Sequence, residues 1–252
     1  MKILLHLVHA TDAVRPLYEA AIRARGIEAD VVTVLPPAAA GGQMSSSYAD
    51  MCIAWGLDGL TPLQGLLRDY PGPSGTYQGW FLASWSAGYK LVERALYSRH
   101  AEALVGAVML DSGHAAFDGD GTPADRQLEP FVDLARRAAA GEGLLWVAHT
   151  DVQTPQRGPG AFASTTQWAA ELVRLAKPAA PGPLFRIEAF NREPPERAKQ
   201  EHIGALLAWG PSFVGDAIAA WIRETSARDS LAGVAFDKIR KGVEAGSEGL
   251  DP

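Results

Sequence analysis

The sequence predicts an α/β fold, with a mostly parallel central sheet flanked by helices on both faces. Apolar runs of strand length alternate with stretches of helical period along most of the 252 residues. Such alternation is typical of parallel sheets whose right-handed crossovers place helices on both faces. The chain length suits one large domain and shows no internal repeat. We expect this domain at residues 1–235 and a flexible tail, rich in glycine and charge, at 236–252.

The expected strands are short apolar runs that stop at polar residues or prolines. The first, "KILLHLVHA" (2–10), is rich in aliphatic residues and ends at a polar Thr-Asp pair. The second, "EADVVTVLPP" (28–37), closes with two prolines, which terminate a strand. Four further strands are expected at 75–85, 103–111, 143–151 and 182–190.

The expected helices follow these strands and carry start and stop signals. The helix at 12–26 has Gly26 as its stop, and the helix at 164–177 has Ser164 as its N-cap. The last helix, 211–224, places one apolar face toward the sheet. This face consists of Val214, Ala217, Ile218, Trp221 and Ile222. Other helices are expected at 61–70, 86–99 and 125–140, with a long irregular stretch at 38–59.

Composition restricts the partners and the compartment. The chain has 23 Lys and Arg against 29 Asp and Glu, a formal net charge of −6, which disfavours nucleic acid or an anionic membrane as a partner. Cys52 is the only cysteine, so no intramolecular disulfide can form. No run of about 18 apolar residues occurs, and the apolar start is interrupted by His6, so it reads as a strand rather than a secretion signal. We therefore expect a cytoplasmic protein.

The strongest candidate site is the serine turn Ser84-Trp85-Ser86-Ala87-Gly88, which follows a strand and opens a helix. Ligands of open α/β sheets bind beyond the carboxyl ends of the strands. A nucleophile on such a turn needs small neighbours two residues before and after it, as in G-x-S-x-G. Gly88 satisfies the second position, and Ser84 is a small substitute at the first. A serine that only caps the following helix is the alternative, but the strand-to-helix context favours Ser86 as a nucleophile.

A serine nucleophile needs a base and a carboxylate that orients this base, and both should follow it in the chain. Asp151, directly after the strand at 143–151, is the favoured acid. Asp111 also ends a strand and is the alternative. Of the six histidines, His202 follows the last strand and precedes the last helix, so it is the expected general base.

Two further groups complete the predicted site. The oxyanion would accept hydrogen bonds from the backbone N–H of Ala87 and from that of Ala10 or Thr11. Large apolar side chains near the serine could line a substrate pocket, or could instead fill the core under a long loop. These side chains are Trp85, Met51 and Trp55.

Four segments together resemble the α/β-hydrolase superfamily over about residues 1–225. They are the elbow-like "ASWSAGY", the oxyanion-loop-like "LVHAT", and the acid and histidine loops "AHTDVQTP" and "EHIG". The resemblance implies a compact hydrolase that lacks the leading antiparallel strands of the family. It also implies Ser86 as nucleophile, Asp151 as acid and His202 as base.

Two positions depart from the family pattern. Ser84 stands where the first glycine of the elbow is usual, and Ala10 stands where a glycine follows the histidine. Both residues are small, so the backbone geometry of the two turns is expected to survive.

The function expected from these residues is hydrolysis of a carboxylic ester through an acyl-enzyme intermediate, without a metal or other cofactor. The substrate would be a small-molecule or polymeric ester. A peptidase, amidase or thioesterase with the same triad is one alternative, and a non-catalytic binding protein is another. A metal enzyme that uses His6, His9 and Asp12 is disfavoured, because a spacing of three puts the histidines on opposite faces of a strand.

Overall fold

The computed structural model confirms the predicted α/β class. It describes residues 2–34, 77–97, 101, 104–150, 162–177, 182–190 and 197–247, with the side chains of 198–199 and 229–247 left out. Its sheet has six strands, all parallel, in the order β2-β1-β3-β4-β5-β6. The strands are β1 (Lys2–Val8), β2 (Glu28–Val34), β3 (Trp80–Trp85), β4 (Leu104–Leu110), β5 (Leu144–His149) and β6 (Phe185–Ala189).

The central strands are buried on both faces, and the edge strands are not. In β1, β3, β4 and β5 almost every residue is buried, as expected for parallel strands covered by helices on both sides. In contrast, β2 and β6 lie at the two edges, and most of their residues are half-buried or exposed. The apolar runs in the sequence therefore mark the middle of the sheet most clearly.

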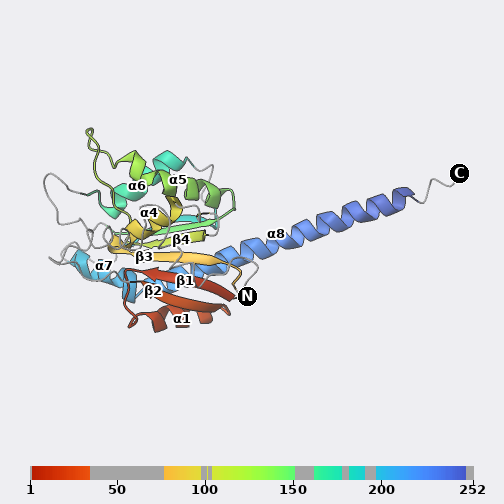
Figure 1. The fold of residues 1–252 in the computed structure, drawn as a ribbon, viewed down its shortest axis with the longest axis horizontal. Helices are drawn as coiled ribbons and strands as arrows, with labels where there is room; N and C mark the ends of the chain where they lie inside the picture. Colours follow the sequence, from red (N-terminus) through yellow and green to blue (C-terminus); the bar gives the residue numbers. More distant parts are fainter. Residues whose placement is uncertain are drawn as a thin grey trace.

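Helices cover both faces of this sheet (Figure 1). One layer contains α4 (Tyr89–Tyr97), α5 (Asp125–Ala139) and α6 (Thr165–Ala176), and the other contains α1 (Arg15–Arg23) and the start of α8 (Gly210–Ser247). α6 begins with a capping box, because Ser164 Oγ accepts from the backbone N–H of Gln167 and the Gln167 side chain accepts from that of Ser164. This confirms Ser164 as the N-cap.

The order of the strands determines where in the sheet the candidate site lies. The chain runs from β1 outward to β2 and then returns to the other side of β1 with β3, so the direction of winding reverses between β1 and β3. Loops that follow two such strands diverge and leave a crevice at the carboxyl edge, where ligands bind in this architecture. Ser86 directly follows β3 at this edge.

The last part of the chain differs from the prediction. α8 buries Val214, Ala217 and Ile218, and half-buries Trp221 and Ile222, as predicted for the helix at 211–224. However, it continues to Ser247 and projects away from the sheet (Figure 1), although the sequence predicted a flexible tail from 236. A helix satisfies its backbone hydrogen bonds within itself, so it can continue without packing partners. The flexibility of this tail stays a prediction.

Some predictions cannot be compared with the fold. The helix at 61–70, the irregular stretch at 38–59 and the residues Met51, Trp55 and Asp151 lie outside the described residues. In the part of the chain that is described, no single helix is long and apolar enough to cross a membrane. Gln200–Leu207 and Gly210–Arg228 meet that criterion only when they are taken together, across a bend of 48°.

Candidate active site

The backbone at Ser86 makes a sharp turn from a strand into a helix. Trp85 ends β3 in an extended conformation, with φ −114° and ψ 141°. Ser86 then adopts φ 52°, a left-handed conformation that is unfavourable for a residue other than glycine. The short 3₁₀ helix η1 (Ser86–Gly88) follows and leads into α4. The half-buried serine is therefore held at a sharp reversal between a buried strand and a helix.

The small neighbours of Ser86 are required by close packing. A Cβ atom added at Gly88 would lie 3.1 Å from the carbonyl oxygen of Val8 and 3.3 Å from His9 Cβ, so glycine lets η1 approach the end of β1. Ser84 is fully buried, and its hydroxyl contacts the Ser112 hydroxyl at 2.9 Å. Ser112 Oγ in turn donates to the backbone oxygen of Ser86 at 2.8 Å. The serine in place of the usual glycine thus takes part in holding the turn.

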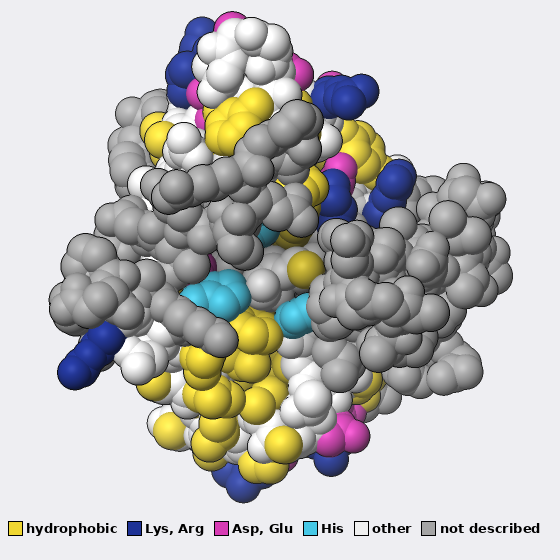
Figure 2. Space-filling view, turned by 90° about the vertical axis from the view of Figure 1, so that its left-hand side faces the viewer, with side chains coloured by type: hydrophobic (Ala, Val, Ile, Leu, Met, Phe, Trp, Pro, Cys, Tyr) yellow, Lys and Arg dark blue, Asp and Glu magenta, His cyan; other side chains and the backbone are white. Residues whose placement is uncertain are grey.

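Three non-glycine residues with positive φ lie at the ends of three adjacent strands. They are His9 after β1 (φ 67°), Ser86 after β3 (φ 52°) and Asp111 after β4 (φ 45°). Such conformations cost about 1–3 kcal/mol each and concentrate at functional sites. Their position on neighbouring strands marks this edge of the sheet as the candidate active site. Figure 2 views the molecule from this side and shows histidine side chains gathered around a recess.

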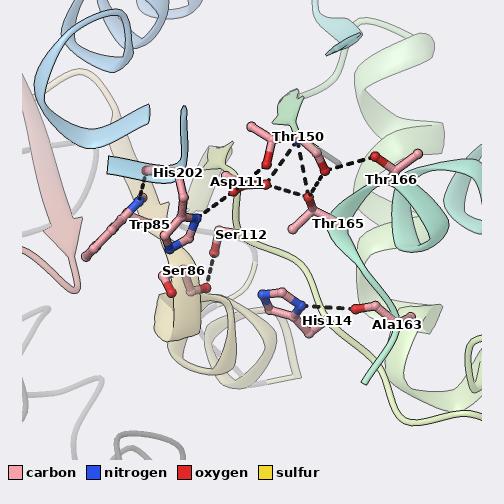
Figure 3. A network of polar contacts seen from close by, with 10 residues as sticks. All are labelled: Trp85, Ser86, Asp111, Ser112, His114, Thr150, Ala163, Thr165, Thr166 and His202. Atoms are coloured by element: carbon pink, nitrogen blue, oxygen red, sulfur yellow. Dashed lines mark hydrogen bonds and ion pairs between the residues drawn. The ribbon is translucent and has the colours of Figure 1, made fainter. Parts of the chain in front are cut away.

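Asp111 is the centre of a buried hydrogen-bond network (Figure 3). Its side chain is only 2% exposed. Oδ1 accepts from the Thr150 backbone N–H at 3.0 Å and from Thr165 Oγ1 at 2.5 Å. Oδ2 accepts from Thr150 Oγ1 at 2.8 Å and lies 2.5 Å from His202 Nδ1. Burial alone would raise the pKa of Asp111, but its contact with His202 and the two threonine hydrogen bonds outweigh it and lower the pKa.

His202 lies between this carboxylate and the serine. It belongs to α7 (Ala198–Leu207), a helix that the sequence did not predict, so it stands on a helix and not in a loop. Its Nδ1 faces Asp111, and its other ring nitrogen points toward Ser86 (Figure 3). The side chain is 21% exposed, so the ring remains accessible from outside.

Trp85 contacts the histidine from the other side. The indole ring of Trp85 packs at 4.8 Å between centroids against the His202 ring, and Nε1 donates to the His202 backbone oxygen at 2.8 Å. The Trp85 ring also contacts His9 at 5.2 Å between centroids. We predicted Trp85 as a substrate-contacting residue. Its indole packs against the rings of His202 and His9. A contact between Trp85 and substrate stays a prediction.

Of the two candidate acids, the structure describes one, and Asp151 stays an untested prediction. Asp111, the alternative, is the carboxylate that contacts His202, whereas Asp151 lies outside the described residues. Asp111 follows β4, which lies between β3 and β5 in the sheet, and this brings it next to the serine strand. Thr150 and Thr165 were not predicted as site residues. Thr150 precedes Asp151 in the "AHTD" segment, and Thr165 is the first residue of α6. No sequence pattern predicts a hydrogen bond from either threonine to Asp111, because 39 and 54 positions separate them from it.

The predicted oxyanion donors lie at the same edge. Ala87 is in η1, directly after Ser86, and is half-buried. Ala10 is buried two residues beyond β1, and Thr11 is exposed. The preceding His9 is anchored by a bond from its backbone N–H to the Val34 oxygen at 2.7 Å. The loop after β1 therefore begins beside the turn, as the position of Gly88 against Val8 and His9 requires.

The three residues of the disfavoured metal alternative make other contacts. The His6 ring is buried, and its Nδ1 accepts a hydrogen bond from Trp80 Nε1 at 2.9 Å. His9 lies beside Trp85, and Asp12 is exposed and accepts from Thr33. Within the described ranges, no group of three or more His, Cys, Asp or Glu side chains could hold a metal ion.

Fold and site together define an α/β protein with a strained serine turn, a histidine and a buried carboxylate at the carboxyl edge of a parallel sheet. No protein-family model matches the chain, and no curated protein matches it. Among solved structures, the chain is similar to TT1662 from Thermus thermophilus, with 12% identity, a TM-score of 0.44, and coverage of 80% of this chain and 87% of the other.

It is also similar to an extracellular α/β-hydrolase from a Paenibacillus species, with 13% identity and a TM-score of 0.37. This match covers 86% of this chain and 96% of the Paenibacillus chain. The Paenibacillus protein is described as sharing structural and functional homology with tobacco salicylic acid binding protein 2. Both likenesses are too distant to carry information on substrate.

Proposed function

We propose that this protein is a serine hydrolase that cleaves carboxylic esters through an acyl-enzyme intermediate. Ser86 is the nucleophile, His202 the general base and Asp111, in place of Asp151, the carboxylate that orients the base. The observation that carries the proposal is the position of His202. One ring nitrogen lies 2.5 Å from a buried carboxylate, and the other points toward a serine held at φ 52°. This is the arrangement that activates a weak nucleophile.

In the first half of the reaction, Ser86 Oγ attacks the ester carbonyl carbon, and Nε2 of His202 takes the hydroxyl proton. Asp111 accepts a hydrogen bond from Nδ1–H and stabilises the imidazolium that forms. The oxyanion accepts from the backbone N–H of Ala87 and of Ala10. The bond to the alcohol oxygen then breaks, and His202 gives its proton to the leaving alcohol. The acyl group stays on Ser86.

In the second half, water attacks the acyl carbon and His202 takes one of its protons. The second tetrahedral intermediate collapses, the carboxylic acid leaves, and the proton returns from His202 to Ser86 Oγ. The starting state is restored without a change in oxidation state.

Two features of Asp111 support its role. Its four hydrogen-bond donors include three from threonines, which keep the carboxylate oriented when His202 changes its charge. These bonds, with that from His202, also lower the pKa of Asp111, so the carboxylate remains charged at neutral pH. A charged partner at Nδ1 fixes the tautomer that leaves the other nitrogen free of a proton.

The test uses an alkyl fluorophosphonate probe, which labels activated serines. The wild-type protein should be labelled, and Ser86→Ala should not be. Ser226→Ala is the matched control, because Ser226 lies on the exposed face of α8 and its loss should leave labelling unchanged. Labelling that survives in Ser86→Ala would contradict the proposal.

A panel of p-nitrophenyl esters, anilides and thioesters then defines the scissile bond. We expect the highest kcat/KM with the esters, because amide hydrolysis demands more precise protonation of the leaving group. A higher kcat/KM for anilides or thioesters would instead favour the peptidase, amidase or thioesterase alternative. Absence of turnover with intact folding would favour a binding protein.

A further inference from the structure

A second histidine outside the triad follows β4, at the same edge of the sheet as Ser86. His114 is in the loop after β4, three residues beyond Asp111, and its side chain is half-buried. Its Nδ1 lies 3.0 Å from the carbonyl oxygen of Ala163. A carbonyl oxygen can only accept, so Nδ1 carries the proton of the neutral ring, and Nε2 presents a lone pair.

The ring of His114 is held from several sides. Ala163, which accepts from Nδ1, also donates its backbone N–H to the Ala115 oxygen at 2.8 Å, so the two segments are joined next to the ring. The ring of Tyr89, the first residue of α4, meets the His114 ring edge-on, with 5.5 Å between centroids and an interplanar angle of 67°. The direction of Nε2 is therefore fixed by the fold.

Nε2 of His114 points toward Ser86 (Figure 3). The ring is close enough to the triad that the charges of Asp111 and His202 act on it. Burial lowers the pKa of His114, so the ring stays neutral and its second nitrogen stays an acceptor at neutral pH. Neither half of the proposed reaction uses this nitrogen.

We propose that His114 Nε2 accepts a hydrogen bond from the acyl part of the substrate, so that the preferred substrates are esters of acids with a hydroxyl or amide N–H close to the carboxyl carbon. This inference rests on the proposed function. The leaving alcohol must approach His202, which gives it a proton, and Figure 3 shows His202 and His114 on different sides of Ser86. The acyl chain is thus the part that faces His114.

The physical basis of this preference is the cost of leaving an acceptor unpaired. When an acyl chain without a donor displaces water from Nε2, the nitrogen loses its hydrogen bond and gains none. A donor on the substrate restores it. One neutral hydrogen bond typically changes an equilibrium or rate by about 3- to 10-fold.

The test compares ester pairs in which only the donor changes. Methyl 3-hydroxybutyrate has a hydroxyl donor, and methyl 3-methoxybutyrate keeps the oxygen without the proton. We expect a ratio of kcat/KM of about 3 to 10 in favour of the hydroxy ester in the wild type. In His114→Asn the ratio should fall to about 1, because the asparagine amide can still donate to the Ala163 oxygen but places no acceptor at the position of Nε2.

His149→Asn is the matched control. His149 ends β5, one strand further from Ser86 than His114, and its Nδ1 contacts Thr166 Oγ1 at 3.0 Å. Its replacement should leave the hydroxy-to-methoxy ratio at the wild-type value. His114→Phe, which keeps an aromatic ring against Tyr89, is a second variant in case the asparagine variant does not fold.

The outcomes separate this inference from the proposed function. Ester turnover with equal kcat/KM for both members of the pair would overturn the role of His114 and leave the hydrolase intact. Equal losses on both esters in His114→Asn would show a purely structural histidine and would also overturn it. A second pair, 2-hydroxyethyl and 2-methoxyethyl butyrate, carries the donor on the alcohol instead. A preference found only in this second pair would contradict the proposal that His114 contacts the acyl part. Without ester turnover or fluorophosphonate labelling, the proposed function itself fails.

Discussion

The indole Nε1 of Trp85 donates a hydrogen bond of 2.8 Å to the backbone oxygen of His202. The residue before the proposed nucleophile thus holds the helix that carries the proposed base, although 117 positions separate them in the chain. The two rings also pack together, with 4.8 Å between centroids. β3 and α7 are therefore joined beside Ser86, and the distance from serine to histidine depends on this joint.

Replacing Trp85 with phenylalanine tests this joint. Trp85→Phe keeps an aromatic ring against His202 but removes the N–H donor, so α7 loses a bond worth about 0.5–1.5 kcal/mol. We expect kcat for ester hydrolysis to fall about 3- to 10-fold, with KM changed less than about 2-fold. Trp146→Phe is the control, because Trp146 Nε1 also donates to a backbone oxygen, that of Pro183, at 2.9 Å. A fall in kcat as large in the control would contradict a local role for Trp85.

Comparison of Asp111→Asn with Asp151→Asn decides between the two carboxylates. An asparagine at 111 cannot supply the charge that fixes the His202 tautomer, and the expected loss in kcat is about 10⁴-fold. We expect Asp151→Asn to stay within about 3-fold of wild type, as is usual for an acid outside the triad. The measurement is kcat on p-nitrophenyl butyrate, with circular dichroism to check folding. The reverse order of losses would restore Asp151 as the acid.

Gly88 offers a test of the packing under the turn. A methyl group in Gly88→Ala would meet the Val8 oxygen at 3.1 Å, so η1 and β1 must separate. Such overpacking typically lowers the free energy of unfolding by about 1–3 kcal/mol, which a urea titration measures. Gly119→Ala is the control, since nothing lies within 4 Å of the added Cβ, and its effect should stay within about 0.5 kcal/mol. Equal effects would show that position 88 tolerates a side chain.

The stability of the protein should decrease on mild acidification because of His9. Burial, with a smaller contribution from the charge of His202, lowers the pKa of His9 to about 4, from 6.5 in an unfolded chain. The unfolded state therefore binds the proton first as the pH falls. The stabilisation is complete above about pH 6.5 and is lost as the pH decreases toward 4, by about 3 kcal/mol in total.

Urea titrations of the wild type and His9→Asn between pH 7 and 4 measure this effect. Asparagine tolerates the φ of 67° at this position and does not titrate. The difference in unfolding free energy between the two proteins should shrink by about 3 kcal/mol across this range. Acid protonation of Asp111 affects both proteins, so it cancels in the difference. Parallel curves would mean that the pKa of His9 is the same in the folded and the unfolded protein.

The alternation of strands and helices was readable from the sequence because it depends on local periodicity. The buried strands β1, β3, β4 and β5 appear as continuous apolar runs, and Ser164 is the N-cap that the sequence indicated. By contrast, α7 was missed, because the apolar residues of Ala198–Leu207 follow the helical period only weakly. A helix of this kind forms through its contacts with Trp85 and α8 and not through its own pattern.

The sequence by itself determined the class of fold, the serine turn with its small neighbours, and the histidine between the last strand and the last helix. These features depend on residues close together in the chain. Only the tertiary structure decided which carboxylate meets His202, and it also gave Trp85 and His114 their positions. In the sequence, Asp111 follows β4 and Asp151 follows β5, so chain order alone does not separate the two candidate acids. The choice follows from three threonine donors and one imidazole that converge on Asp111 from β5, α6 and α7 once the chain has folded.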